Sequence, residues 1–177
     1  MSAGAVAELY ASACFLGDDG AELLAAALDR APHGRLARLS VAGNGIGPQA
    51  VARLAAAAAG AGVELLDFGR VRAAGTLAAD NHVDAEAASA IGLTLASARH
   101  RLTHLVLSHT GMRSREAHRL LDSAPAAPTA TRFVPGKGLA TSVRRRLDAL
   151  SAHLPSPAVA ADVAAVRSVH RTAPPER

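Results

Sequence analysis

The chain has little of several residue types, and each shortage argues against a class of protein. It contains one cysteine, no tryptophan and only 2% aromatic residues among 177. A single cysteine cannot build an internal disulfide framework and gives no indication of an oxidising compartment. No apolar run approaches the roughly 18 residues of a membrane-spanning helix. The N-terminus lacks the basic segment of a signal peptide and meets Glu8 early. We therefore expect a cytoplasmic protein that does not enter a membrane.

Half of the residues are apolar, which is enough for a continuous core in a single domain of this length. Eighteen arginines stand against one lysine beside abundant alanine. This bacterial-like composition is typical of a GC-rich genome and carries no mechanism. Charge is unevenly spread: residues 1–89 have a net charge of −4 and residues 90–177 one of +8. The basic half could attract an acidic partner or a nucleic acid, and solvated surface charge is the simpler explanation.

One sequence repeat occurs five times, with copies that start near residues 6, 36, 63, 102 and 129. In each copy, apolar residues spaced by three and then two precede an Asn-like reference position, and an apolar residue and an Ala/Leu-rich helical stretch follow it. The clearest copies are Leu36, Leu39, Val41, Asn44, Ile46 and Leu54, and Leu102, Leu105, Leu107, Thr110, Met112 and Leu120. Alternating strand and helix phases at a period near thirty residues are typical of a solenoid.

The apolar residues of the two halves of the repeat have different periods. Alternation in Leu39/Val41 predicts a short strand with one apolar side, and the spacing after the turn predicts a helix. One such unit is too small to bury its apolar side alone, so neighbours must stack, with parallel strands on one face and helices on the other. An Asn at the reference position can satisfy backbone groups where the chain leaves the strand.

Two stretches carry a family resemblance. Residues 102–112 (LTHLVLSHTGM) resemble a leucine-rich repeat, and residues 17–28 (GDDGAELLAAAL) are similar to the helix half of its ribonuclease-inhibitor-like subclass. The resemblance covers roughly residues 6–150. It implies an α/β leucine-rich-repeat solenoid of about five repeats, a short right-handed arc with strands on its concave face and helices on its convex face. It also implies that the concave face contacts other macromolecules.

The ends of the chain and one insertion depart from the repeat. We expect an arc over 1–150 with an insertion at 70–80, a capping helix within 151–171 and a disordered tail at 172–177. The fifth copy carries Thr129 and Arg132 where apolar residues are expected. No N-terminal cap is visible, which leaves open a homodimer through that end.

Residues that alternate with the buried leucines face outward and form one ladder on the concave face. Aromatic and Arg residues there are the usual anchors of protein interfaces. The predicted partner-binding residues of this ladder are Tyr10, Arg38, Ser40, Asp67, His104, Val106 and Phe133. The insertion adds Arg70 and Arg72, because long loops between compact repeats are often functional. Exposed residues without a role are the competing interpretation of both sets.

Catalytic and cofactor motifs are not recognisable. His100, His104, His109 and His118 cluster in sequence, but their placement on different elements, without a Cys or paired carboxylates, argues against a metal site. The Gly-Asn-Gly-Ile-Gly run at 43–47 has Pro48 where the third glycine of a dinucleotide fingerprint belongs. We therefore expect no enzyme activity, no metal and no cofactor.

The sequence leaves three functions in competition. The first is a non-catalytic scaffold that binds another protein on the concave face. The second is a nucleic-acid-binding module that uses the basic C-terminal half, although that half has almost no aromatic residues to stack on bases. The third, by analogy with the family alone, is a regulator that inhibits or activates a partner enzyme.

Overall fold

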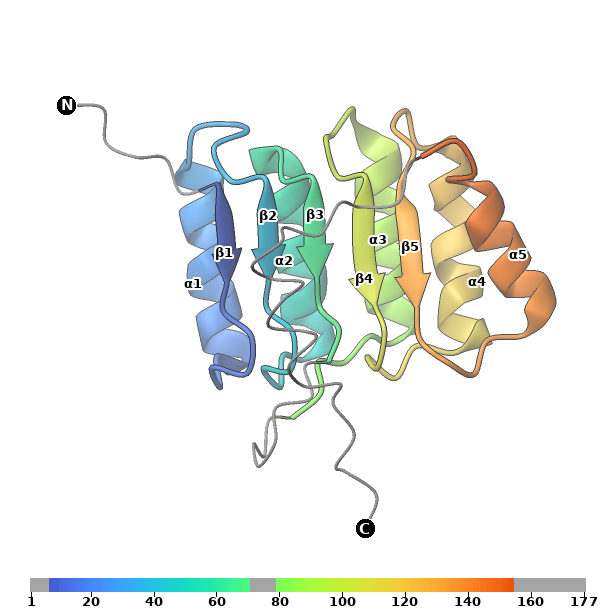
Figure 1. Ribbon diagram of the computed structural model, residues 1–177, viewed down its shortest axis with the longest axis horizontal. Helices are drawn as coiled ribbons and strands as arrows, with labels where there is room; N and C mark the ends of the chain where they lie inside the picture. The colour runs from blue at the N-terminus through green and yellow to red at the C-terminus, as the bar shows by residue number, and fades with distance from the viewer. Residues whose placement is uncertain (1–6, 71–78, 155–177) are drawn as a thin grey trace, which may run out of the picture.

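A computed structural model describes residues 7–70 and 79–154 as alternating strands and helices (Figure 1). The strands are β1 (Glu8–Tyr10), β2 (Arg38–Ser40), β3 (Leu65–Asp67), β4 (His104–Leu107) and β5 (Arg132–Pro135). The helices are α1 (Gly17–Arg30), α2 (Pro48–Ala61), α3 (Ala85–Ser97), α4 (Ser114–Ser123) and α5 (Thr141–Ala149), with a short 3₁₀ turn, η1 (Ala124–Ala126), after α4. Each strand begins two or three residues after the start of a sequence repeat.

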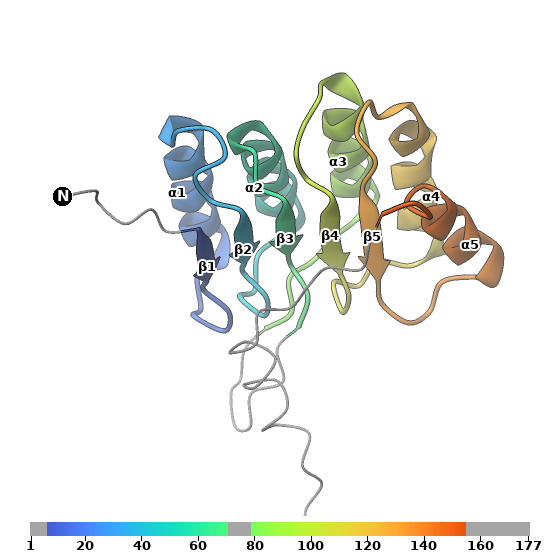
Figure 2. The same cartoon turned by 45° about the horizontal axis from the view of Figure 1, so that its top comes forward.

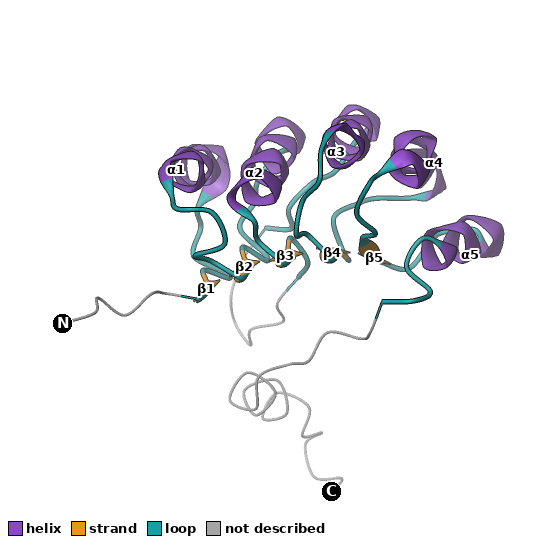
Figure 3. Cartoon of the chain, turned by 90° about the horizontal axis from the view of Figure 1, so that it is seen from above, coloured by secondary structure: helices purple, strands orange, loops and turns teal. Residues whose placement is uncertain are grey.

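All five strands belong to one parallel sheet in the order β1-β2-β3-β4-β5. Helices α1 to α4 stand in a row on one side of this sheet, and α5 lies at its β5 end (Figures 2 and 3). The prediction of an α/β protein with parallel strands alternating with helices is confirmed.

The core lies between the sheet and the helix row. Leu39, Leu66 and Leu105 are paired in register across β2, β3 and β4 and are fully buried. Leu54 and Leu120 meet them from α2 and α4. With few aromatic residues in the chain, alanines fill much of the space between neighbouring helices, and small side chains let these helices approach closely.

Local sequence signals set the helix ends. Helix α2 begins at Pro48, whose missing N–H costs nothing in the first turn, and is followed by Gly62 in the left-handed conformation with φ +80°. The Asp84 carboxylate caps α3 by accepting a hydrogen bond from the Ala87 N–H at 2.8 Å.

The predicted role of asparagine at the strand exit is confirmed in two consecutive units. Asn44 Oδ1 accepts from the Cys14 N–H at 2.8 Å, and its Nδ2 donates to the carbonyls of Ala11 and Val41 at 2.7 and 2.8 Å. Asn81 makes the corresponding bonds one unit later. Each asparagine therefore pairs buried backbone groups of its own unit and of the preceding one.

The turn around the reference position also recurs. Residues just before and after that position are left-handed in three units: Ala13 and Phe15, Gly43 and Gly45, and His109 and Gly111. The first unit holds this backbone without glycine, and its reference residue, Cys14, is exposed rather than buried.

Only the first four residues of the predicted capping segment are described. Residues 151–154 form a turn beside β5, where Arg132 Nη2 donates to the Ser151 carbonyl at 3.2 Å. The rest of the predicted 151–171 capping helix and the 172–177 tail lie outside the described residues.

Candidate functional site

The side of the sheet opposite the helix row, here called the helix-free face, carries the alternate strand side chains. Within residues 7–70 and 79–154 no helix covers it (Figure 3). Six of the seven predicted ladder residues take register positions on this face: Tyr10, Arg38, Ser40, Asp67, His104 and Val106. Parallel pairing therefore brings the predicted residues of β1 to β4 side by side.

One partly exposed region of the face is a polar cluster on β1 and β2. The Tyr10 hydroxyl donates to Glu8 Oε2 at 2.9 Å, and Arg38 Nε lies 3.5 Å from Glu8 Oε1. Partial burial and the hydrogen bond to Glu8 raise the pKa of Tyr10. Tyr10 is 43% exposed. The same carboxylate therefore holds an aromatic ring and a guanidinium side by side on this face.

Ser40 and Asp67 correct the expectation of an accessible ladder, because both are buried. Ser12 Oγ and Ser40 Oγ lie 2.9 Å apart, and Ser40 Oγ donates to Asp67 Oδ2 at 3.2 Å. Asp67 Oδ1 accepts from the Gly69 N–H at 2.8 Å. Short polar side chains on adjacent strands reach one another, so this chain of hydrogen bonds orders the face and leaves Ser40 and Asp67 little exposed.

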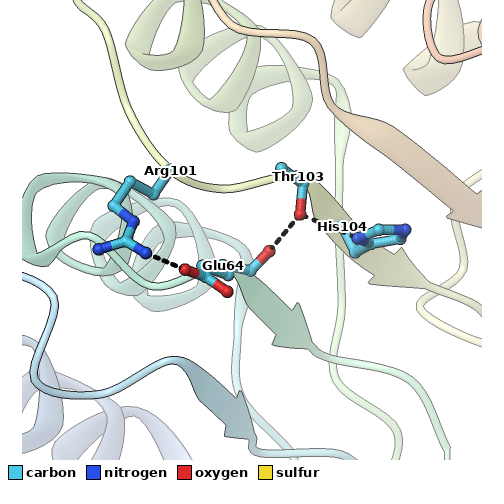
Figure 4. A network of polar contacts seen from close by, with 4 residues as sticks. All are labelled: Glu64, Arg101, Thr103 and His104. Carbon is cyan, nitrogen blue, oxygen red and sulfur yellow. Dashed lines mark hydrogen bonds and ion pairs between the residues drawn. The ribbon is translucent and has the colours of Figure 1, made fainter. Parts of the chain in front are cut away.

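His104 is also buried and belongs to a second network, which joins β4 to the start of β3 (Figure 4). Thr103 Oγ1 lies 3.0 Å from His104 Nδ1 and donates to the Glu64 carbonyl at 3.1 Å. The Glu64 carboxylate forms an ion pair with Arg101. A sequence repeat aligned on leucines contains no signal for Glu64 or Arg101, because both lie outside the strands.

Phe133 was placed on the wrong side of the sheet. It pairs in register with Leu105, is 3% exposed and belongs to the core. Its neighbour Val134 is instead 37% exposed on the helix-free face. A shift of one residue along a strand moves every side chain to the opposite face. Val134 is therefore a face residue that the sequence analysis missed.

The predicted insertion is described only at its ends. Arg70 is exposed, and its Nε lies 3.4 Å from Asp80 Oδ1, so an ion pair closes the base of the segment. Arg72 lies outside the described residues.

Four basic residues of the C-terminal half lie between the end of β5 and the end of α5. Lys137, Arg145 and Arg146 are exposed, and Arg144 Nη2 donates to the Gly136 carbonyl at 2.8 Å. In the described residues no aromatic side chain of this half is exposed beside them, since Phe133 is in the core.

Acidic side chains of the described residues gather at one place without forming a metal site. No group of three or more His, Cys, Asp or Glu side chains there could hold a metal ion. An open hollow of about 480 Å³ is lined by Asp18, Asp84 and Glu86. Asp18 accepts from the Gly47 N–H at 2.5 Å, and Asp84 caps α3, so two of these carboxylates already serve the backbone.

Comparison with known proteins identifies no family. No protein-family model matches the chain, and neither does any curated protein. Among the described residues no helix is long and apolar enough to cross a membrane. The fold and the face therefore define an α/β protein with a five-stranded, all-parallel sheet.

Proposed function

We propose that the chain is a leucine-rich-repeat-type solenoid and acts as a non-catalytic scaffold that binds another protein on its helix-free face. The observation that carries this proposal is the Glu8–Tyr10–Arg38 cluster on the sheet side without helices, in which Tyr10 is exposed and Glu8 and Arg38 are partly exposed and bonded to one another or to Tyr10. Tyr and Arg are the residue types that most often dominate binding energy in protein interfaces.

The regularity of the units supports the solenoid assignment. Strands follow one another in chain order, and Asn44 and Asn81 repeat one hydrogen-bond pattern. In such an arrangement consecutive strands build one extended surface from short pieces of sequence. Val106 and Val134 continue that surface from the polar cluster toward β5, and their partial exposure gives it an apolar component.

The experiment is affinity capture from nuclease-treated native lysate with the wild-type chain and a Tyr10→Ala/Arg38→Ala variant. An Arg145→Ala/Arg146→Ala variant serves as the matched control on α5. A protein recovered by wild type and control but lost with the face variant supports the proposal. Equal recovery by all three chains contradicts the site.

Nucleic-acid binding by the basic half is the second candidate, favoured by the exposure of Lys137, Arg145 and Arg146. It predicts that in lysate without nuclease the α5 variant loses recovery and the face variant does not, and that nuclease treatment abolishes recovery by all three chains. Its affinity would also fall steeply with ionic strength.

A further inference from the structure

Among the described residues, the first β–α unit ends the sheet, and no other described element covers its apolar edge. Leu9 is 36% exposed, although its register partner Leu39 is fully buried. On α1, Leu23 is 73% exposed and Ala27 is exposed as well. Ala57 occupies the position of Ala27 one unit later and is buried beneath its neighbours. The first unit therefore has the residues of an interior unit and not those of a polar cap.

The outer edge of β1 also presents backbone N–H and C=O groups that do not pair with β2. The Ala7 carbonyl accepts from the Arg38 N–H at 3.1 Å, and the Ala11 N–H donates to the Ser40 carbonyl at 2.8 Å. Alternation along a strand then turns the N–H and C=O groups of Glu8 and Tyr10 away from β2. These groups make no backbone hydrogen bond to another described residue.

We propose that this edge pairs with the same edge of a second copy of the chain, through a two-fold axis beside Leu9. The outward backbone groups are self-complementary in an antiparallel pairing. Glu8 of each copy forms a hydrogen-bonded pair with Tyr10 of the other, and the two Leu9 residues face each other in the non-hydrogen-bonded position between them. Cα atoms at such a position lie about 4.5 Å apart, so the leucine side chains cover one another.

The same axis places the two α1 helices side by side and antiparallel on one side of the joined sheet. Gly20 and Ala27 are small enough for a close helix approach, and Leu24 is only partly buried within one chain. Helix α1 has Asp18 and Asp19 in its first turn and Arg30 in its last. An antiparallel pair sets the acidic end of each helix beside the basic end of its mate, whereas a parallel neighbour would set like charges together. This charge pattern favours a second copy over a further unit of the same orientation.

The dimer does not rest on the proposed function, because it uses the strand edge and the α1 flank and leaves the Tyr10 and Arg38 side chains on the face. It joins two sheets into one and doubles the helix-free face. A bivalent face binds a repeated partner more tightly than either half alone.

The first test measures the mass of the full chain under reducing conditions by light scattering and by sedimentation over a range of concentrations. We expect a species of twice the 17.9 kDa chain mass that dissociates on dilution. Ala27→Glu, which places like charges near the axis at an exposed helical position, should raise the dissociation constant at least about tenfold. Ala149→Glu on the exposed side of α5 should leave it unchanged. A chain that stays monomeric throughout, or a dimer that Ala27→Glu does not weaken, overturns the proposal.

A second test reports the geometry and does not depend on a disrupted interface. In a Cys14→Ser background, Leu9→Cys should form an intermolecular disulfide on mild oxidation, because the pairing brings the two Cα atoms within disulfide range. Leu93→Cys, at an exposed leucine of α3, should not. Equal cross-linking of the two variants, or none at position 9, overturns the two-fold pairing.

Discussion

The side-chain oxygen of Asn81 accepts a hydrogen bond from the backbone N–H of Asn44 at 3.2 Å and a second from the Ile46 N–H at 3.0 Å. Its Nδ2 donates to the carbonyls of Val41 and Phe68, both at 2.9 Å. One buried amide thus ties the second unit to the third.

Replacing that amide should cost more than a single hydrogen bond. Asn81→Ala leaves two buried N–H groups and two buried carbonyls without this partner, and we expect a loss of about 3 kcal/mol in the free energy of unfolding. Thr110→Val removes only the bond from Oγ1 to the Leu107 carbonyl at 2.8 Å and should cost about 1 kcal/mol. Urea unfolding followed by circular dichroism measures both values. Equal losses would show that the asparagine is not a tie between units.

The corrected strand register makes an opposite pair of predictions at neighbouring residues. Phe133→Ala empties a core position and should cost about 3–5 kcal/mol of stability. Val134→Ala, on the helix-free face, should change stability by no more than about 0.5 kcal/mol. If urea unfolding showed a larger stability loss for Val134→Ala than for Phe133→Ala, the predicted outward position of Phe133 would be correct after all.

Phe15 has φ +56° and is largely exposed at a turn position where the later units have Gly45 and Gly111. A left-handed backbone is costly for a residue with a Cβ and costs glycine little. Both Phe15→Gly and Phe15→Ala lose the ring, but only the alanine variant keeps a Cβ and therefore the backbone strain. The glycine variant should be about 1 kcal/mol more stable than the alanine variant. Thermal unfolding of the two variants tests this, and a less stable glycine variant would contradict it.

His100 should make stability depend on pH. Burial lowers the pKa of its imidazole, the Leu95 carbonyl opposes that shift, and neither ring nitrogen reaches hydrogen-bond geometry. The unfolded chain, with an ordinary histidine pKa of about 6.5, then binds more protons than the fold below that pH. Stability contributed by the neutral ring is thus complete above about pH 6.5 and falls as the pH is lowered toward the folded pKa.

The measurement compares urea midpoints at neutral and mildly acidic pH for wild type and His100→Leu. His100→Leu has no imidazole to protonate and no unpaired buried nitrogens. Because only the wild type is destabilised by protonation at this position, the stability of the variant relative to wild type should rise as the pH falls. His118→Leu, at an exposed position of α4, is the control and should run parallel to wild type. A wild-type/His100→Leu difference that is the same at both pH values would contradict the account.

Much of the fold could be predicted because its signal is periodic. Spacing alone located Leu39 and Leu105 in strands of one parallel sheet, and the polarity of Asn44 predicted its hydrogen bonds to backbone groups where the chain leaves the strand. The fifth strand failed because Phe133 and Val134 are both apolar, and only tertiary packing chooses between two frames one residue apart.

The candidate site was less predictable for a different reason. Alternation along a strand tells which side a residue faces, but not whether neighbours cover it. Ser40, Asp67 and His104 were assigned to the correct side, yet their burial follows from contacts among residues on different strands. Such contacts depend on the register between units, which no single repeat encodes.

The most direct measurement of the central claim is the dissociation constant of the captured partner protein for three chains. These are wild type, Tyr10→Ala/Arg38→Ala on the helix-free face and Arg145→Ala/Arg146→Ala on α5. If the face is the interface, the first variant weakens binding by about tenfold or more, and the second changes it less than about twofold. Unchanged affinity of the face variant together with a loss on α5 would contradict the account and assign binding to the basic end of the chain.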